Sequence, residues 1–398
     1  MSEAVIVSAV RTPIGRANKG VLKDVRADDL AAVAVKAAVE RVPQLDRSLI
    51  EDLILGCAFP EGEQGMNLAR IVVALAGLPE TAGGVTVNRF CASSLQAVNM
   101  AAQSIMLDLG EVMIAGGVEA MSRVPMGGFN PSFNPRLIKA REGEEGSLSY
   151  PPCELEYGYS SYIPMGMTAE NLAHQYKISR EAQDAFALRS HQRAIAAIDS
   201  GVFKREIVPV PLPSGRLMEV DEGPRRDTTL ERLASLEPAF IKGGSVTAGN
   251  SSPLNDGASA IVLMSAQKAH DMGITPLAKI RTMAVAGVDP AYMGIGPVPA
   301  MRKLLQRSGL QLSDIDIIEL NEAFAAQTLS VVQAMGIDEE KLNPHGGAIA
   351  LGHPLGSSGA RLIATLINDL QTADKTLGIA TLCVGGGQGV ATLIERMS

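Results

Sequence analysis

Short runs of apolar, often β-branched residues alternate along this chain with alanine-rich segments whose apolar positions recur every three or four residues. The first pattern is typical of buried strands and the second of amphipathic helices. In the N-terminal part it predicts strands at residues 4–8, 53–57, 84–88 and 111–115, and helices at 27–42, 67–76 and 93–109. Such alternation predicts an α/β fold around a parallel or mixed sheet.

Residues 124–168 break this alternation. They are rich in Pro, Gly, Asn, Tyr and Ser and show no sustained periodicity, and a loop of that length usually forms a lid or a subunit contact. A helix is predicted to follow, with Ser179 as its N-cap and Gly201 just beyond its end. The strand-like residues 260–264 then resume the core, so we interpret residues 119–250 as an insertion that covers a site.

Two parts of the chain resemble each other. Residues 93–94 (Ser-Ser), a predicted helix and a strand ending at residues 116–117 (Gly-Gly) correspond to residues 357–358, a helix and a strand ending at residues 385–386. Self-similarity of this kind indicates a repeated structural unit. Two similar halves that face each other would bring their strand-to-helix loops together at one cleft.

Composition narrows the class of protein. The 398 residues are 46% hydrophobic and 20% charged, which excludes disorder and allows two or three domains with a large core. The net charge of −8 disfavours a nucleic-acid or anionic-membrane surface. No apolar run approaches the ~18–20 residues that a bilayer requires. We therefore expect no nucleic-acid partner and no membrane association.

The four cysteines, at positions 57, 91, 153 and 383, have no CxxC spacing. This spacing supports neither a disulfide scaffold nor a thiolate zinc site, so no metal is expected. Reduced thiols indicate a reducing compartment. Because the N-terminal segment lacks the basic region and cleavage site of a signal peptide, the predicted location is the cytoplasm.

Cys91 follows one predicted strand and begins a predicted helix. The N-terminus of a helix favours negative charge, so a thiol there should ionise more readily and be a better nucleophile. The alternative is a small buried cysteine that packs at a turn, which is common for an isolated cysteine.

Two further segments are dense in glycine. GGAIALGHPLG at residues 346–356 surrounds His353, and because glycine lets the backbone approach a ligand, His353 is a candidate base or oxyanion donor. CVGGGQG at residues 383–389 lacks the third glycine of a dinucleotide-binding loop, but its turn could present an N–H group to an oxyanion. Asn321, after the strand-like residues 315–320, could hold a water or cap the next helix.

Taken together, these segments resemble the thiolase family over essentially the whole chain. Seven blocks carry the resemblance: residues 88–97 around Cys91, 116–122, 165–171 (MGMTAEN), 245–257 (SVTAGNSSPLNDG), 321–325, 346–361 and 383–389. The resemblance implies the thiolase fold, an α/β fold in which two similar βαβαβαββ halves form a five-layered α-β-α-β-α core with an inserted loop domain. The expected domains are residues 1–118 with 251–275, the loop domain 119–250 for CoA binding and oligomer contacts, and residues 276–398.

The resemblance also implies catalytic roles. Cys91 would be the nucleophile that carries the acyl group as a thioester, and His353 would take its proton and polarise the substrate carbonyl together with a water held by Asn321. Cys383 would be the acid/base that moves the proton at the α-carbon of acetyl-CoA. The N–H groups of Cys91 and Gly385 would form a second oxyanion hole. A stabilised enolate and a tetrahedral intermediate require two such sites.

Coenzyme A would then be a substrate lying along the loop domain, and no cofactor is expected. The resemblance assigns contacts with CoA or acyl-CoA to Arg225 near the phosphates, to Ser252 near the pantetheine arm, and to Met165, Phe324, Ala248 and Met293.

Two positions depart from the family pattern. Biosynthetic acetoacetyl-CoA thiolases usually have a histidine where this chain has Pro164, which favours the degradative branch. His345 stands where thiolases commonly have asparagine, and we assign it no catalytic role. The expected function is therefore cleavage of 3-ketoacyl-CoA by CoA to acetyl-CoA and a shortened acyl-CoA, by a ping-pong route through an acyl-cysteine, in fatty-acid β-oxidation.

The alternative enzyme is a biosynthetic acetoacetyl-CoA thiolase that condenses two acetyl-CoA molecules. A CoA- or lipid-binding protein without activity is disfavoured, because Cys91, His353 and Cys383 are all present. The resemblance further implies a homodimer or homotetramer, with other β-oxidation enzymes as further candidate partners.

Overall fold

The computed structural model describes residues 2–134 and 162–397, and within them the chain forms one unit twice. The first consists of β1 (Ala4–Arg11), α1 (Ala27–Glu40), β3 (Asp52–Gly56), α2 (Leu68–Leu75), β4 (Gly83–Val87), α3 (Ser93–Met106), β5 (Val112–Ala120) and β8 (Asn255–Ser265). The second consists of β9 (Ala278–Gly287), α8 (Pro297–Ser308), β10 (Ile317–Leu320), α9 (Ala325–Met335), α11 (Ser358–Thr372), β11 (Leu377–Val384) and β12 (Gln388–Arg396). A parallel bridge between Ile318 and Leu342 takes the place of β4 in the second unit.

The strands of both units join in one ten-stranded sheet with the order β10-β11-β12-β9-β1-β8-β5-β3-β4, and β2 (Gly15–Arg16) pairs with β8. β3 is parallel to β4 and β5, and β10 is parallel to β11. The units meet where β1 and β9 pair through only two residue pairs, Val5 with Lys279 and Ile6 with Ala278. Each unit therefore keeps its own part of the sheet.

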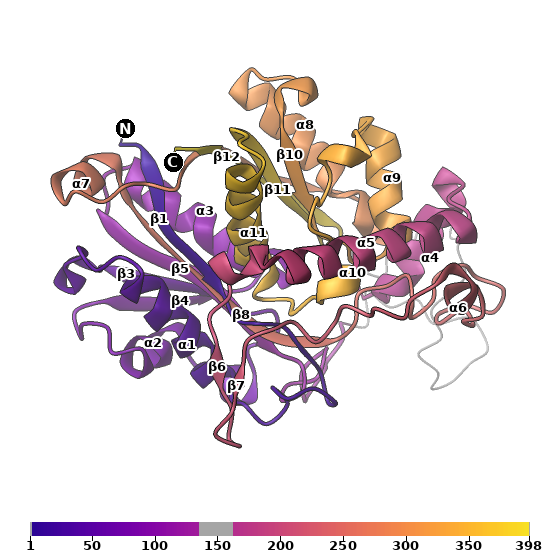
Figure 1. Cartoon of the computed structure of the whole chain (residues 1–398), viewed down its shortest axis with the longest axis horizontal. Coiled ribbons are helices and arrows are strands. Elements are labelled where there is room, and N and C mark those ends of the chain that lie inside the picture. Colours follow the sequence, from indigo (N-terminus) through magenta and orange to yellow (C-terminus); the bar gives the residue numbers. More distant parts are fainter. Residues whose placement is uncertain (1, 135–161, 398) are drawn as a thin grey trace.

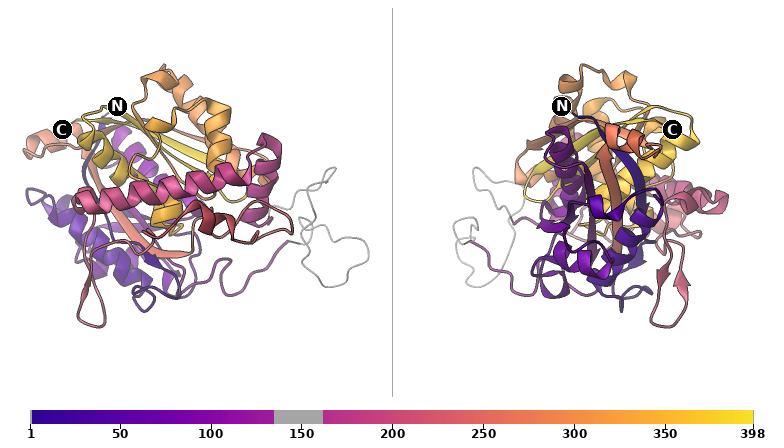
Figure 2. Two further views of the ribbon diagram at one scale, coloured as in Figure 1. Left: turned by 45° about the vertical axis from the view of Figure 1, so that its right-hand side comes forward. Right: turned by 90° about the vertical axis from the view of Figure 1, so that its left-hand side faces the viewer.

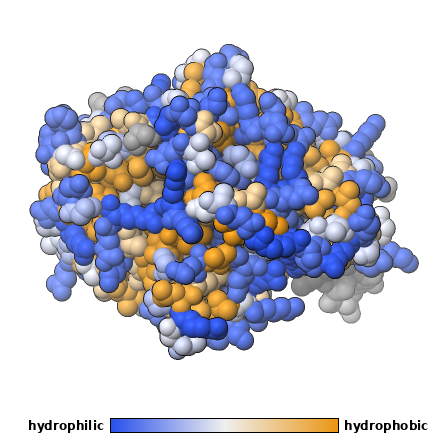
Figure 3. Space-filling model, viewed as in Figure 1, coloured by the Kyte–Doolittle hydropathy of each residue, from blue (hydrophilic) through white to orange (hydrophobic). Residues whose placement is uncertain are grey.

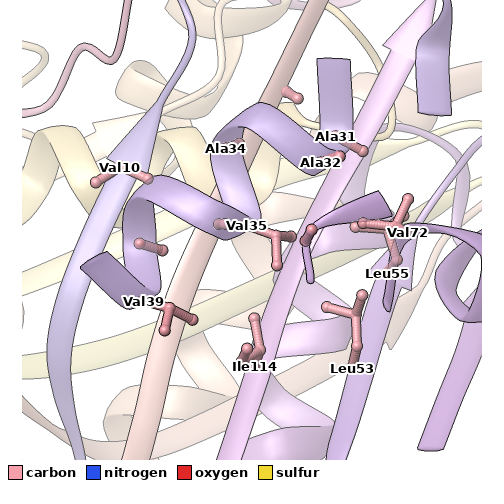
Figure 4. Close-up of a cluster of buried hydrophobic side chains, with 14 of the residues drawn as sticks. Val10, Ala31, Ala32, Ala34, Val35, Val39, Leu53, Leu55, Val72 and Ile114 are labelled. Atoms are coloured by element: carbon pink, nitrogen blue, oxygen red, sulfur yellow. The ribbon is translucent and has the colours of Figure 1, made fainter. Parts of the chain in front are cut away.

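Three clusters of buried apolar side chains define the layers. In the first, Val35 and Val39 of α1 pack on Leu53 of β3 and Ile114 of β5, as Figure 4 shows. The second joins α3 and α11 between the two parts of the sheet, and the third packs α8 and α9 on the outer face of the second part. Burying one such valine or leucine contributes about 1.5–3 kcal/mol. The result is the five-layered α-β-α-β-α order expected from the sequence.

The helices α3 and α11 touch at their N-terminal ends. Ser94 Oγ accepts a hydrogen bond from the backbone N–H of Ala360 at 2.9 Å. A side chain on Gly359 would lie 2.3 Å from the backbone nitrogen of Leu95, so glycine is needed for this approach. The contact brings the loops that precede the two helices to one place, as the repeat in the sequence predicted.

The chain leaves the sheet between β5 and β8. Within the described part this insertion holds α4 (Met165–Tyr176), α5 (Arg180–Ser200), the strands β6 (Val210–Pro211) and β7 (Leu217–Met218), and α6 (Leu230–Ala234). In Figure 1, α5 crosses the front of the molecule next to α10 (Ala348–Leu351), and the β6–β7 hairpin projects from the body in Figure 2. The visible face is mostly hydrophilic, with smaller hydrophobic groups between (Figure 3).

The predicted helix after Ser179 is confirmed as α5. Its N-cap is Ser179, whose hydroxyl accepts a hydrogen bond from Ala182 N, and it ends at Gly201 with φ 75°. Of the loop predicted at residues 124–168, residues 135–161 lie outside the described residues, and α4 begins at Met165. The prediction that Gly116 and Gly117 end a strand is wrong, because β5 continues to Ala120. A side chain on Gly117 would lie 2.0 Å from Gly356 O, so glycine here admits another loop.

Candidate active site

Cys91 lies in a short turn of 3-10 helix, Phe90–Ala92, between β4 and α3. Phe90 has φ 41°, a strained value for a non-glycine residue. The Asn88 side chain holds the turn, because its Oδ1 accepts from Phe90 N and its Nδ2 donates to Ala58 O, each at 2.8 Å. The turn is therefore a fixed part of the fold that places Cys91 at the end of β4.

The expectation that a helix start makes Cys91 ionise more readily is wrong for the free protein. α3 begins only at Ser93, and Cys91 is 7% exposed. Burial raises the pKa of the Cys91 thiol to about 11, even though the N–H groups of Gly385 and of Cys91 itself act to lower it. The resting side chain is therefore a thiol, and a base must remove its proton during any reaction.

Cys383 lies near the end of β11 and is fully buried. Burial raises the pKa of this thiol, and the nearby Cys91 raises it further. Met165, Met293 and Phe324 belong to the same apolar cluster as Cys383. The two cysteines thus lie within electrostatic reach of each other, and apolar side chains surround Cys383.

His353 follows α10 in a glycine-rich loop and is 4% exposed. Its backbone N–H donates to Asn255 Oδ1 at 2.9 Å. Its Nδ1 lies 2.6 Å from Ser358 Oγ, and because that hydroxyl donates to Pro354 O at 2.8 Å, it accepts from Nδ1–H. Nε2 therefore keeps its lone pair, which is the form of histidine that can take a proton.

Asn321 faces this lone pair. Its Nδ2 lies 3.2 Å from His353 Nε2, where it can donate. It does not cap the next helix, because α9 begins at Ala325 with Phe324 as the N-cap residue. Its Oδ1 is buried and has no hydrogen-bond partner among the described residues, so it can accept from a group entering the site. Burial, together with the charge of Arg361, lowers the pKa of His353 to about 3.

Three loops from both halves meet at this site. Cys91 and Leu355, two residues beyond His353, belong to one apolar cluster. The N–H of Gly385, from the turn after β11, acts on the Cys91 thiol. Across this turn, Arg89 donates to Gln388 Oε1 at 2.7 Å, and Gln388 Nε2 donates to Gly385 O at 3.3 Å.

The residues expected to contact CoA are less closely grouped. Ser252 is half-buried, and its N–H donates to Ala323 O at 2.9 Å, next to Phe324. Arg225 and Ala248 are exposed. The Arg225 backbone N–H donates to Nδ1 of the buried His191 at 3.2 Å, which leaves the guanidinium to solvent or to a ligand.

The sequence did not single out Ser358 as the partner of His353, nor Gln388 as the partner of Arg89. Ser358 stood out only as part of the repeat. A hydroxyl five residues beyond a candidate base was the one available signal, and it is a weak one.

Two features concern residues 2–134 and 162–397 as a whole. No helix among them is long and apolar enough to cross a membrane. In the same residues, no group of three or more His, Cys, Asp or Glu side chains could hold a metal ion.

A buried thiol, a neutral imidazole whose Nε2 carries its lone pair and N–H donors on the thiol form a site that can transfer an acyl group through a thioester. The class is that of acyl-transferring α/β enzymes with a duplicated core. Family models agree: "Thiolase, N-terminal domain" matches residues 4–267 and "Thiolase, C-terminal domain" matches residues 274–396. The chain belongs to the thiolase family and is an acyltransferase.

The chain is similar to named thiolases over its full length. It is 48% identical to a 3-ketoacyl-CoA thiolase of Bacillus subtilis over 99% of this chain and 100% of that protein. It is 50% identical to a beta-ketoadipyl-CoA thiolase of Pseudomonas aeruginosa over 99% of each. Human mitochondrial 3-ketoacyl-CoA thiolase in complex with CoA superposes with a TM-score of 0.89 at 39% identity, covering 100% of this chain and 98% of that one. The acetyl-CoA acetyltransferase of Bacillus anthracis gives 0.88 at 44%, covering 100% and 99%.

Proposed function

We propose that this protein cleaves 3-ketoacyl-CoA with free CoA to give acetyl-CoA and a shortened acyl-CoA, as in the β-oxidation of fatty acids. The observation that carries the proposal is the meeting of Cys91 from the turn after β4, Cys383 from the end of β11 and His353 from the loop after α10 in one buried site. A binding protein would not need two thiols within electrostatic reach of each other.

In the first half-reaction, the Cys91 thiol gives its proton to His353 Nε2 while its sulfur bonds to the C3 carbonyl carbon of the substrate. The C2–C3 bond then breaks, and its electron pair stays on C2 of the leaving acetyl-CoA enolate. Cys383 gives a proton to that carbon. The Asn321 amide and the N–H groups of Cys91 and Gly385 are placed to stabilise charge on the two carbonyl oxygens.

In the second half-reaction, the thiol of a new CoA attacks the acyl-Cys91 thioester. The proton of this thiol passes to Cys383, and Cys91 leaves with the proton held on His353. The shortened acyl-CoA departs, and both cysteines are again thiols. Because each product carries the CoA of its own half-reaction, the route is ping-pong, and CoA is a substrate, so no separate cofactor takes part.

Substrate binding is proposed at the insertion. Met165, Met293 and Phe324 line the apolar surroundings of Cys383, which suits an acyl chain or the pantetheine arm. The exposed Arg225 suits the phosphates of CoA, and Ser252 and Ala248 lie on the segment between α6 and β8.

The alternative is a biosynthetic enzyme that joins two acetyl-CoA molecules. Acetyl-CoA acetyltransferases are among the similar structures. The direction proposed here rests on Pro164, the residue just before α4, where a histidine is usual in biosynthetic thiolases, and on the 3-ketoacyl-CoA thiolase names of the relatives.

The dependence of activity on the acyl chain length of the substrate distinguishes the degradative from the biosynthetic enzyme. We expect kcat/KM for 3-ketoacyl-CoAs of six to sixteen carbons to exceed that for acetoacetyl-CoA, since no polar neighbour of a short-chain pocket stands at Pro164. Activity confined to the four-carbon substrate would establish the alternative.

The two cysteines can be separated by variants. Cys91→Ser should form no acetyl-enzyme with acetyl-CoA and lose iodoacetamide labelling at position 91. Cys383→Ala should still acetylate Cys91, but should no longer exchange the methyl protons of acetyl-CoA with deuterated water. Mass spectrometry measures acetylation and labelling of the protein, and NMR measures the exchange of the methyl protons. Turnover of both variants within a few-fold of wild type would show that the thiols are structural.

We further propose a cytoplasmic homodimer or homotetramer. Light scattering should give at least twice the mass of the chain, and an active monomer would refute this.

A further inference from the structure

Glu119 has no part in the chemistry above, yet it lies fully buried beside the site, near the end of β5. Its Oε2 accepts from Ala58 N at 2.8 Å and from Gly356 N at 2.9 Å. Its Oε1 accepts from Phe59 N at 3.2 Å and from Gln64 Nε2 at 2.9 Å. A single carboxylate on β5 thus holds two other parts of the chain, residues 58–64 and the loop at Gly356, which are distant from each other in sequence.

These segments include both sides of the reacting pair. Ala58 belongs to the apolar cluster that contains Cys91. Gly356 is three residues beyond His353, and a side chain on it would lie 2.4 Å from Val118 O and 2.9 Å from Glu119 Oε2. The His353 loop therefore rests directly on β5, and Glu119 is its hydrogen-bonding anchor there.

The partners of Glu119 indicate that it is ionised. Each of them is a donor, including the Cys57 thiol, whose sulfur lies 3.7 Å from Oε1. A protonated carboxyl group would turn its own O–H against a donor. Burial raises the pKa of Glu119, and these hydrogen bonds oppose the rise. Within the described residues, none of the ion pairs includes Glu119.

A buried charge with no cation is costly, so a purely structural explanation is weak. Its charge does reach the nucleophile, because burial raises the pKa of Cys91 and the charge of Glu119 acts in the same direction to a smaller extent. The other polar groups around the thiol are Cys383 from β11 and the N–H groups of Cys91 and Gly385, with His353 in the loop that Glu119 anchors.

We propose that Glu119 is a positioning residue with two effects: its carboxylate sets the distance between the Cys91 turn and the His353 loop, and its negative charge adds to the burial that keeps Cys91 in the thiol form until substrate arrives. The first effect needs the length of the side chain, and the second needs its charge. The proposal rests on the function proposed above for its effect on turnover, but not for its effect on Cys91.

Two variants separate the effects. Glu119→Gln keeps the length but removes the charge, and Glu119→Asp keeps the charge but is one methylene too short to hold all its partners. Both should lower kcat/KM for thiolysis. The pH midpoint for iodoacetamide labelling of Cys91, followed by peptide mass spectrometry, should move to lower pH in Glu119→Gln alone, so that labelling at pH 8 is faster than in the wild type.

A lower turnover combined with faster labelling is the expected signature, since simple damage to the site would not move the midpoint in only one variant. Glu206→Gln is the matched control, because Glu206 is a buried carboxylate with partners in both halves. It should leave the Cys91 midpoint unchanged. Circular dichroism checks that each variant is folded.

An unchanged midpoint in Glu119→Gln, or an equal shift in Glu119→Asp, would overturn the proposal. If Glu119→Gln does not fold, Glu119→Asp decides: reduced kcat/KM with a wild-type midpoint supports the proposal, and wild-type kcat/KM refutes it. Labelling needs no acyl-CoA, so the role of Glu119 can be tested even if the protein proves not to cleave 3-ketoacyl-CoA.

Discussion

Replacing Ser358 with alanine removes the hydroxyl that fixes the tautomer of His353. With alanine, the present tautomer would bury an Nδ1–H donor with no acceptor. The other tautomer becomes competitive, because the Asn321 amide can rotate and offer its Oδ1, which has no partner among the described residues, to Nε2–H. In that tautomer His353 cannot accept the proton of Cys91.

The size of the effect follows from the lost hydrogen bond. A buried donor left without its acceptor costs about 1–3 kcal/mol. At tenfold for each 1.36 kcal/mol, the ratio of the competent tautomer to the other falls roughly 5- to 150-fold, which is the upper limit of the loss. We expect kcat to fall by up to that factor. KM should change little, because the Ser358 hydroxyl is occupied by Pro354 and His353.

Steady-state thiolysis of Ser358→Ala measures this, with Ser357→Ala as the matched control. Ser357 is also buried, but its hydroxyl donates to Ser259 Oγ at 3.1 Å and does not bond His353. The control should keep kcat within about threefold, since its lost hydrogen bond affects stability alone. A folded Ser358→Ala enzyme with wild-type kcat, or equal losses in both variants, would refute the tautomer argument.

Three other outcomes are expected. Gly359→Ala, which places a methyl group 2.3 Å from Leu95 N, should destabilise the fold by about 1–2 kcal/mol in urea unfolding, because overpacking exceeds the gain in helix propensity; an unchanged midpoint would contradict this. Burial lowers the pKa of His191 to about 4, so its contribution to stability is complete above its unfolded pKa and is lost as pH falls toward 4; His191→Gln should remove about 1 kcal/mol per pH unit from the slope of stability near pH 5.5, and an unchanged slope would contradict this. Arg89→Met and Gln388→Ala should each lower kcat/KM, and the double variant should lose no more than the worse single one, since both act through one chain of hydrogen bonds; additive losses would show independent roles.

The sequence pattern predicted well those helices and strands whose ends are set by residues close by in the sequence. α5 begins at Ser179 and ends at Gly201 because a hydroxyl cap and a left-handed glycine act within one turn of the helix. The strands β1 and β5 are longer than predicted, since pairing along β8 extends both. Gly117 was misread for a related reason: its role is to admit the Gly356 carbonyl, and that contact joins residues far apart in the sequence.

In the candidate site, too, the sequence predicted some residues and could not predict others. Cys91, His353, Asn321 and Cys383 lie in motifs that mark them, and the structure brings them together. Their partners could not be predicted, because a hydrogen bond such as Glu119 to Gly356 exists only once both halves have folded. The direction of the Cys91 pKa was also beyond reach, since burial in the folded protein outweighs the N–H groups of Gly385 and Cys91.

The buried state of the reacting pair constrains the order of events. Burial raises the pKa of Cys91 to about 11 and, together with the charge of Arg361, lowers that of His353 to about 3, so burial favours the neutral form of both groups in the free protein. In the proposed reaction the proton moves as the sulfur bonds to the carbonyl carbon, when the negative charge passes to an oxygen that N–H donors can stabilise. The same burial that suppresses ionisation thus makes the nucleophile selective, because only a substrate that places its carbonyl against those donors lowers the barrier to attack.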